Sequence, residues 1–211
     1  MAEGMVSEDE ARRLQECVAG GGVAVFPTDT VYGLCCDPDD EQAARRLYEL
    51  KGRPATRASA VMFFGLEHAF AALRELPVAE RLALEVLLPG PLTLLMANRS
   101  EGFSAACRLD PGTLGLRVPR LPHRLSALNA ITCPLMQSSA NRSGEPDARS
   151  LEEIPPELLE GADLVIDGGA LPGTPSTVID LRDYDRERRW HVLREGALPR
   201  KSVQQMLAAL A

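Results

Sequence analysis

The chain has 211 residues, of which 45% are apolar and 25% are charged. These proportions are typical of a globular domain with one hydrophobic core, and they exclude disordered, collagen-like and coiled-coil proteins. No stretch approaches the roughly 18 consecutive apolar residues of a membrane span, and the N-terminal residues are polar and acidic. We therefore expect neither a transmembrane helix nor a secretory signal.

The net charge of −7 indicates that the surface as a whole does not attract nucleic acid, although it leaves room for a local basic cavity. The five cysteines are odd in number and include no Cys-x-x-Cys pair, the spacing that a disulfide framework or a zinc site needs. The three histidines stand far apart. The sequence therefore predicts no protein-held metal site and a reducing, cytoplasmic compartment.

Short apolar runs alternate with helix-like stretches along the first half of the chain. Ser7 and Glu10 match a capping box, which predicts a helix that continues to about Ala19 and ends at three glycines. The elements predicted next are a strand at 23–26, a helix from Asp39 or Asp40 to Gly52, a strand at 60–64, helices at 67–73 and 78–88, and a strand at 92–97.

The second half continues the same alternation. Strands are predicted at 114–118, 135–138, 164–167, 177–181 and 190–194, with a short helix at 123–129 and a polar loop at 139–150. Ser202 and Gln205 predict a capped C-terminal helix of about 202–210. Because we find no internal repeat and no linker, we expect a single α/β domain over residues 1–211, with a mixed sheet and flanking helices.

Five polar segments lie beside predicted strands, where a rigid scaffold can present them to a ligand. They are Phe-Pro-Thr-Asp-Thr-Val-Tyr-Gly-Leu at 26–34, Lys-Gly-Arg-Pro at 51–54, Pro-Gly-Pro-Leu-Thr at 89–93, Ser-Ser-Ala-Asn-Arg-Ser-Gly at 138–144 and Pro-Ser-Thr-Val-Ile-Asp at 175–180. No Walker phosphate loop, dinucleotide fingerprint or hydrolase nucleophile elbow occurs in the sequence.

Two of these segments favour a phosphate ligand. Lys51 and Arg53 close a predicted helix, so both cationic groups can converge on one anion, although cations at this position also complement the helix dipole. Ser139 and Asn141 offer neutral donors of the kind that cradle a phosphate or a ribose. The same side chains also stabilise loops through local backbone bonds, and that alternative stays open.

A buried cation and a run of hydroxyls are further candidates for ligand contacts. Arg117 stands in an apolar strand on the face opposite Leu116, so it needs a partner, either an internal carboxylate or the carboxylate of a ligand. Thr28, Thr30 and Tyr32 alternate and would point to one side of an extended segment, although β-propensity alone also favours these residue types.

Taken together and in order, the five segments closely resemble the YrdC-like family of threonylcarbamoyl-AMP synthases, which serve the formation of threonylcarbamoyladenosine in transfer RNA. The resemblance runs from about residue 8 to residue 198. It is specific because a Lys-x-Arg, a Ser-x-Asn and a Ser-Thr-x-x-Asp must all appear in sequence around the Pro-Thr-Asp-Thr-x-Tyr-Gly and Pro-Gly-Pro-Leu-Thr blocks.

The resemblance implies a twisted α/β sheet with a deep, concave, locally basic cavity. It implies a nucleotidyltransferase that converts L-threonine, bicarbonate and ATP, with magnesium, into threonylcarbamoyl-AMP and pyrophosphate. The partners expected for such an enzyme are tRNA-modifying transferase proteins, which receive the product, and tRNA or double-stranded RNA, which it would bind weakly. Lys51 and Arg53 would hold the triphosphate as the catalytic cations. The other contacts that the resemblance implies are Thr113, Ser139, Asn141 and Arg194 to the nucleotide, and Thr30, Arg117 and Ser176 to threonine. We also expect Arg57 to add a cation at the nucleotide, and Thr28 and Tyr32 to contact threonine together with Thr30.

The sequence departs from the family pattern in three places. Arg57-Ala58-Ser59 replaces an Asn-Pro-Leu-like step, Leu88 replaces an aromatic residue before Pro-Gly-Pro-Leu-Thr, and the chain matches the short, single-domain form. Two alternative functions therefore stay open. One is a related enzyme that makes a carbamoyl-adenylate for another acceptor, and the other is a non-catalytic module that binds double-stranded RNA.

Overall fold

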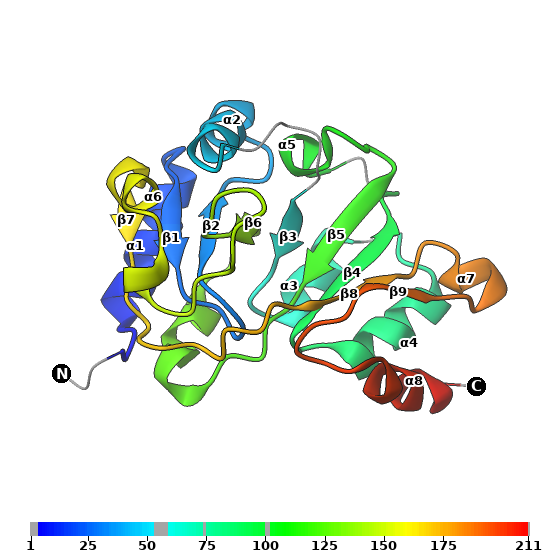
Figure 1. The fold of residues 1–211 in the computed structure, drawn as a ribbon. Coiled ribbons are helices and arrows are strands. Elements are labelled where there is room, and N and C mark those ends of the chain that lie inside the picture. The colour runs from blue at the N-terminus through cyan, green and yellow to red at the C-terminus, as the bar shows by residue number, and fades with distance from the viewer. Residues whose placement is uncertain (1–3, 53–58, 74, 100–101, 211) are drawn as a thin grey trace.

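The sheet is the organising element of the fold. The computed structural model describes residues 4–52, 59–73, 75–99 and 102–210. Within these residues the strands form one nine-stranded sheet in the order β7-β1-β2-β6-β3-β5-β4-β8-β9 (Figure 1). Both pairing directions occur, since β1 runs antiparallel to β2 whereas β3 runs parallel to β5. The predicted single-domain α/β fold with a mixed sheet and flanking helices is confirmed.

The strands are short and most of the helices span three turns or fewer. The strands are β1 Ala24–Phe26, β2 Gly33–Cys36, β3 Ala60–Met62, β4 Leu92–Ala97, β5 Thr113–Arg117, β6 Leu135–Ser139, β7 Leu164–Val165, β8 Thr177–Asp180 and β9 His191–Arg194. The α-helices are α1 Glu8–Ala19, α2 Glu41–Leu50, α3 Leu66–Ala72, α4 Val78–Leu87, α5 Ser104–Cys107, α6 Pro156–Gly161, α7 Tyr184–Glu187 and α8 Arg200–Ala208, and the 3-10 helices are η1 His123–Ala130 and η2 Leu151–Glu153.

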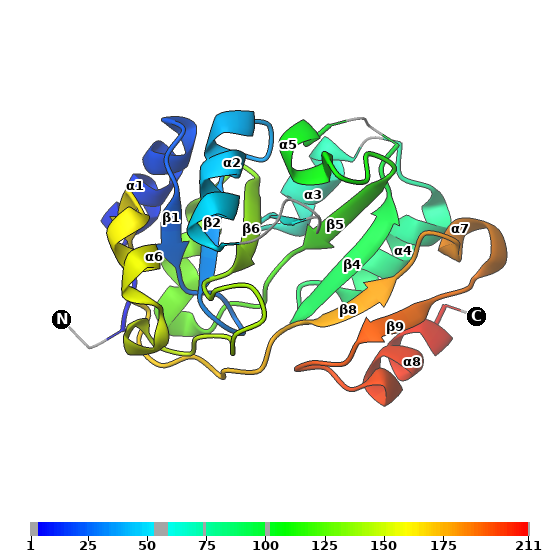
Figure 2. The same ribbon diagram turned by 45° about the horizontal axis from the view of Figure 1, so that its top comes forward.

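The alternation of side chains along a strand separates a core face from a polar face of the sheet. In β5, Leu114 and Leu116 are buried in the hydrophobic core, whereas Thr113, Gly115 and Arg117 line a cavity on the opposite face. This arrangement confirms that Arg117 and Leu116 lie on opposite faces. Figure 2 shows α3 and α4 behind β4 and β5, and Leu84 and Leu87 of α4 belong to the same hydrophobic core as Leu114 and Leu116.

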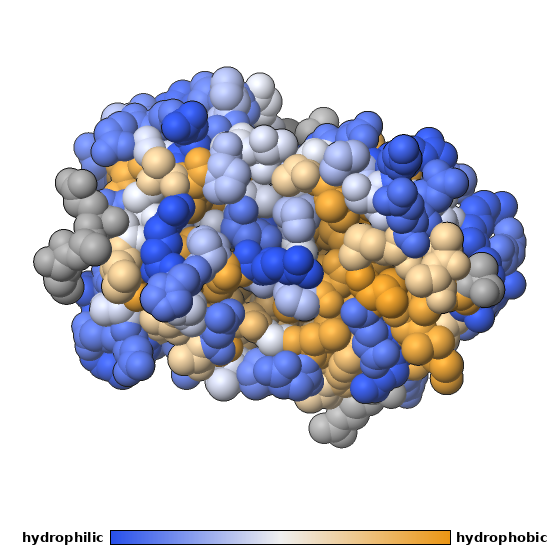
Figure 3. Space-filling model, turned by 90° about the horizontal axis from the view of Figure 1, so that it is seen from below, coloured by the Kyte–Doolittle hydropathy of each residue, from blue (hydrophilic) through white to orange (hydrophobic). Residues whose placement is uncertain are grey.

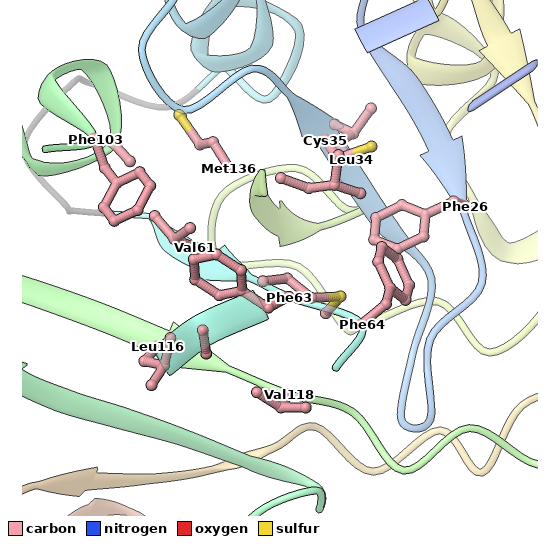
Figure 4. Close-up of a cluster of buried hydrophobic side chains, with 14 of the residues drawn as sticks. Phe26, Leu34, Cys35, Val61, Phe63, Phe64, Phe103, Leu116, Val118 and Met136 are labelled. Atoms are coloured by element: carbon pink, nitrogen blue, oxygen red, sulfur yellow. The ribbon is translucent and has the colours of Figure 1, made fainter. Parts of the chain in front are cut away.

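Four phenylalanine side chains from β1, from the segment after β3 and from the residue before α5 pack together in the core (Figure 4). The rings of Phe26 and Phe64 meet edge to face at 6.4 Å between centroids, and those of Phe63 and Phe103 at 5.9 Å. Burial of each such side chain contributes about 1.5–3 kcal/mol, so this cluster accounts for much of the stability around β1, β3 and α5.

Helix ends place two of the functional segments. Ser7 and Glu10 form the predicted capping box of α1, and Asp40 caps α2 by accepting bonds from the second and third residues that follow it. The α2 helix ends at Lys51, and Gly52 then adopts a φ of +55°, a left-handed conformation that glycine adopts at little cost. The chain thus turns sharply just after the Lys51 side chain.

Two sequence predictions are wrong. Helix α8 begins at Arg200 after Pro199 and has no side-chain cap, because the fixed φ of proline starts the helix and Ser202 donates its backbone N–H to the Pro199 carbonyl. The sequence also predicts no strand between residues 26 and 39, whereas β2 lies at Gly33–Cys36. Residues 27–32 connect β1 to β2, which pair antiparallel. The polar residues of this connection made the short strand that follows it hard to predict from the sequence.

The face seen from below in Figure 3 is mixed, with apolar residues gathered on its right half. Helix α4 lies on that side of the molecule in Figure 1, and its Val78 and Leu82 side chains are 74% and 42% exposed.

No helix in the described part of the chain is long and apolar enough to cross a bilayer.

Candidate active site

A cavity of about 810 Å³ opens on the polar face of the sheet, within the size range of small-molecule and nucleotide sites. Its walls come from β3, β4, β5, β6, β8 and β9 and from the loops that follow α2 and β6. Four cationic residues and three carboxylates line it among the described residues, so it is slightly basic in a protein of net charge −7. The charged lining residues are Lys51, Arg117, Arg182, Arg194, Asp110, Glu145 and Asp147.

One end of the cavity is built around Lys51. This residue is 2% exposed, and its Nζ donates to the Ser139 carbonyl oxygen and, at 3.1 Å, to Asn141 Oδ1. Asn141 Oδ1 also accepts a bond from Ser139 Oγ at 2.6 Å, and its Nδ2 donates to the Glu145 carbonyl at 2.6 Å. The ammonium, the hydroxyl and the amide are therefore held together as a preformed set.

Gly144 completes this end of the cavity. Its φ is +90°, and an added Cβ would meet nothing within 4 Å, so this glycine is required by backbone conformation rather than by crowding. The loop from Ser139 to Gly144 lines the same cavity as Lys51, with open space beside Gly144. Neutral donors and a cation around open space are what an anionic ligand such as phosphate requires.

The centre of the cavity contains Arg117, which is paired with an internal carboxylate. Its Nη2 donates to Asp29 Oδ1 at 2.9 Å, and both side chains are 4% exposed. Its Nη2 also lies 3.2 Å from Thr30 Oγ1, and its Nη1 lies 3.4 Å from Gln137 Oε1. Burial raises the pKa of the Asp29 carboxyl, although the neighbouring Arg117 charge acts in the opposite direction. Of the two partners that the sequence left open for Arg117, the internal one is present.

A second arginine lies where β8 meets β9. Arg194 donates to the Ser176 carbonyl oxygen at 2.8 Å and contacts Ser176 Oγ at 3.3 Å, and Ser176 Oγ is 2.8 Å from Thr93 Oγ1. These hydroxyls and the guanidinium line the cavity together. The Pro-Gly-Pro-Leu-Thr and Pro-Ser-Thr-Val-Ile-Asp segments therefore meet there, since β4 and β8 are parallel neighbours.

Thr113 lies at the far end of the cavity, beside Arg182 and among apolar side chains. Arg182 Nη1 is 3.4 Å from Thr113 Oγ1, and Arg182 is held by two bonds to Asp180, at 2.9 Å and 2.6 Å. Leu95, Val178 and Leu193 form the adjacent wall. This end combines an apolar surface with a few fixed polar groups, the composition of a site for an organic ligand.

Three residues predicted to contact threonine do not line the cavity. Thr28 Oγ1 donates to the Val31 carbonyl, and Thr30 reaches the site only through its contact with Arg117. The Tyr32 hydroxyl lies on the opposite side of the loop, where it accepts a bond from the Gly168 N–H and donates to the Gly169 carbonyl. These side chains alternate only in an extended strand, and residues 27–32 form a loop. Arg53 and Arg57 lie outside the described residues.

Sequence reasoning missed four residues of the site. Gln137 precedes Ser139 by two positions in β6, so strand periodicity could have placed both on one face. Thr93 and Asp29 stand inside segments that were singled out, but nothing in the pattern indicated that Thr93 lines the cavity or that Asp29 pairs with Arg117 behind it. Arg182 had no sequence signal, because its position depends on its pairing with Asp180.

Strand β6 fixes the spacing between the Lys51 end and Arg117. The Ser139 carbonyl contacts Lys51 and the Gln137 side chain contacts Arg117. Two residues along a strand span about 7 Å, so the two cations act on neighbouring parts of one cavity. This spacing allows an anionic group and a carboxylate to be bound side by side.

Comparison with known proteins identifies the family. A sequence model of the Sua5/YciO/YrdC family, described as telomere recombination, matches residues 16–196. A threonylcarbamoyl-AMP synthase of Chromohalobacter salexigens is 33% identical over 187 residues, which cover 86% of this chain and 100% of that protein. The chain belongs to the Sua5/YciO/YrdC family.

Other members of the Sua5/YciO/YrdC family are longer than this chain. The threonylcarbamoyl-AMP synthase of Pyrococcus abyssi is 30% identical over 191 residues, which cover 90% of this chain and 55% of that protein. The crystal structure of P. abyssi Sua5 in complex with L-threonine superimposes with a TM-score of 0.82 at 29% identity, covering 95% of this chain and 58% of that one. The chain thus spans little more than half the length of these relatives.

Proposed function

We propose that this protein synthesises threonylcarbamoyl-AMP from L-threonine, bicarbonate and ATP and releases pyrophosphate, for the threonylcarbamoyladenosine modification of tRNA. The observation that carries the proposal is that one cavity contains a buried ammonium and a buried guanidinium, which contact β6 two residues apart, at Ser139 and Gln137. Membership of the Sua5/YciO/YrdC family and the threonine complex of the P. abyssi relative support the choice of substrate.

In this proposal the triphosphate of ATP occupies the Lys51 end. The Lys51 ammonium, already held by Ser139 and Asn141, would neutralise phosphate charge. The second N–H of Asn141 Nδ2 would donate to a phosphate oxygen, and the Ser139 hydroxyl would do so by exchanging its bond to Asn141 Oδ1 for one to the phosphate. Arg53 and Arg57 would add cations from the segment that follows α2. Thr113 and Arg194 would contact the rest of the nucleotide.

Threonine would bind at the centre of the cavity. The Arg117 guanidinium binds the amino-acid carboxylate while it stays paired with Asp29, and Thr30 acts through Arg117 rather than by direct contact. Ser176 would contact threonine, and its bond to Thr93 fixes the direction of its hydroxyl. The geometry gives no support to direct contacts from Thr28 or Tyr32.

The chemistry needs positioning more than a side-chain base. The threonine amine adds to the carbon of carbon dioxide or bicarbonate, with loss of water in the second case, and forms a carbamate. A carbamate oxygen then attacks the α-phosphorus of ATP, and pyrophosphate leaves in line. Because the substrate supplies the nucleophile, the protein accelerates the reaction by aligning the two reactants and stabilising the developing charge, which is the work of fixed cations and hydroxyls.

Magnesium would enter with ATP. Among the described residues no three His, Cys, Asp or Glu side chains are grouped as a metal site would require, so the phosphates and water would supply most of the ligands. When bound, the ion neutralises phosphate charge. The product is a reactive mixed anhydride, and we propose that it is handed to a tRNA-modifying transferase protein.

The test is pyrophosphate release with ATP, bicarbonate and each of the twenty amino acids in turn. We expect release that depends on threonine and on bicarbonate, and formation of the adenylate, measured by mass spectrometry. Release that depends on another amino acid would instead identify an enzyme that makes a carbamoyl-adenylate for a different acceptor. Absence of release together with salt-sensitive retention of double-stranded RNA would identify a binding module.

A further inference from the structure

We propose that Asp29 is a positioning residue for the amino-acid substrate, because it holds the Arg117 guanidinium in the orientation that binds the substrate carboxylate. The inference rests on the proposed function, since it concerns the same substrate and the same cavity. Asp29 does not itself line the cavity.

Both oxygens of the Asp29 carboxylate are engaged. Oδ1 accepts a bond from Arg117 Nη2 at 2.9 Å, and Oδ2 accepts one from the Arg120 backbone N–H at 3.0 Å. The bond to Nη2 orients the Arg117 side chain at the end of β5. The bond from Arg120 anchors the Asp29 carboxylate to the backbone that follows this strand. Asp29 therefore cannot turn without breaking one of the two bonds, and its orientation is fixed by the fold.

The hydrogen bonds of the guanidinium are concentrated on one of its terminal nitrogens. Asp29 and Thr30 occupy Nη2, whereas Nη1 has a long contact of 3.4 Å to Gln137. Nε is buried and makes no hydrogen bond within the described residues. Nη1 carries a second N–H besides the one that contacts Gln137, and Arg117 lines the cavity, so a ligand carboxylate can accept from Nη1 without displacing Asp29.

Positioning matters because an arginine side chain has several rotatable bonds. An arginine without a fixed partner would lose conformational freedom on binding the substrate, and its affinity would fall. The Asp29 bond removes this freedom before the substrate arrives. Asp29 should therefore influence threonine binding strongly and the nucleotide, bound at the Lys51 end, weakly.

The experiment compares two buried carboxylates that each pair with an arginine. Asp29→Asn removes the charge beside Arg117. Glu80→Gln does the same to Glu80, which is fully buried in α4, holds Arg99 at 2.8 Å and 2.9 Å and does not line the cavity. We expect both variants to lower the melting temperature. Only Asp29→Asn should raise the KM for threonine, by at least tenfold, with the KM for ATP changed less than threefold.

Asp29→Glu provides a second variant if Asp29→Asn does not fold. It keeps the charge but moves the carboxylate by one methylene, and we expect a smaller rise in the KM for threonine. An unchanged threonine KM in whichever variant folds would overturn the inference, and so would an equal rise in Glu80→Gln. Wild-type protein that shows no threonine dependence would instead overturn the proposed function.

An NMR measurement tests, without enzyme turnover, whether Asp29 fixes the orientation of the Arg117 guanidinium. The Nε–H of Arg117 is buried, so its nitrogen–proton NMR signal should be sharp in the substrate-free protein, and Arg117→Lys assigns it by deletion. We expect the signal to persist in Glu80→Gln and to broaden or disappear in Asp29→Asn. A signal that is unchanged in Asp29→Asn would show that Asp29 does not position Arg117.

Discussion

Lys51 and Asn141 are 90 positions apart in the sequence, yet Lys51 Nζ donates to Asn141 Oδ1 at 3.1 Å. The lysine closes helix α2 and the asparagine follows strand β6, so this contact joins two separate elements at the wall of the cavity. Because the amide oxygen and the Ser139 carbonyl already accept from the ammonium, its position is set before any ligand binds. This preorganised cation is the group on which the proposed nucleotide chemistry depends.

Replacement of Lys51 should remove adenylate formation and leave the fold intact. Lys51→Met keeps most of the aliphatic stem of the side chain and removes the charge that would contact the triphosphate. We expect kcat/KM to fall by at least a hundredfold, about 2.7 kcal/mol of transition-state stabilisation. Pyrophosphate release measures the loss, and circular dichroism verifies the fold.

The second lysine of the chain provides the control for this prediction. Lys201 is exposed on α8, so Lys201→Met should have the activity of the wild type. Wild-type turnover by Lys51→Met would contradict the triphosphate assignment.

Substitution of Arg117 should mainly raise the threonine requirement. Arg117→Lys keeps a positive charge opposite Asp29 but removes the planar donor fork. Loss of one charge-assisted hydrogen bond costs about 1.5–3 kcal/mol, equivalent to a rise of roughly 10- to 150-fold in the KM for threonine. Initial rates at varied threonine and saturating ATP measure it. A threonine KM that stays at the wild-type value would rule out Arg117 as the carboxylate-binding group.

Arg117→Ala should be much less stable than Arg117→Lys, because it leaves the Asp29 carboxylate buried without its partner. Breaking a buried ion pair in this way costs about 3–5 kcal/mol. Denaturant unfolding of the two variants measures the difference. Equal unfolding free energies would indicate that Asp29 finds another partner.

Gly196 should not tolerate a side chain. An added Cβ would overlap the Pro175 carbonyl oxygen and lie 2.7 Å from the carbonyl carbon of Ser176, so the backbone that holds Ser176 would have to move. We expect Gly196→Ala to lose about 1–3 kcal/mol of stability, a drop of some 2–4 °C in melting temperature for each kcal/mol, together with weaker threonine binding.

Gly112→Ala is the matched control for Gly196→Ala. A Cβ at Gly112 would meet only Asp110 Oδ1, at 3.6 Å, which is an ordinary contact. Calorimetry and threonine titration should therefore separate the two variants. Equal behaviour would show that the segment around Ser176 can shift freely.

Asp163 should make stability depend on pH on the acid side. The Arg46 guanidinium, bound to Asp163 at 2.6 Å and 3.0 Å, lowers the pKa of that carboxyl below its ordinary value of 3.8, and the Val23 N–H acts in the same direction. A carboxyl group whose pKa is lower in the folded than in the unfolded state stabilises the fold at pH values above its unfolded-state pKa. This contribution is lost as the pH falls through the folded-state pKa.

Wild-type protein should therefore be more stable than Asp163→Asn at pH 7, and the difference should shrink below about pH 4. Urea unfolding of both proteins from pH 7 to pH 3 measures it. A difference that grows as the pH falls would contradict the sign of the pKa shift.

Much of the fold could be predicted from local patterns. The capping box at Ser7 and Glu10, the β5 strand with Arg117 opposite Leu116, and the turn after Lys51 all follow from periodicity or from the preferences of single residues. Strand β2 and the start of α8 escaped prediction. A four-residue strand and a proline-started helix carry weak local signals, and their pairing partners decide them.

Residue types and their spacing are local properties of the chain, so they were enough to predict which segments carry the chemistry and that these segments belong to one α/β domain. The tertiary structure alone decided which side chains of those segments face the cavity. It turned the Tyr32 hydroxyl toward Gly168 and brought Asp29 against Arg117, 88 positions away. Such contacts depend on the order of strands in the sheet, and hydrophobic periodicity does not encode that order.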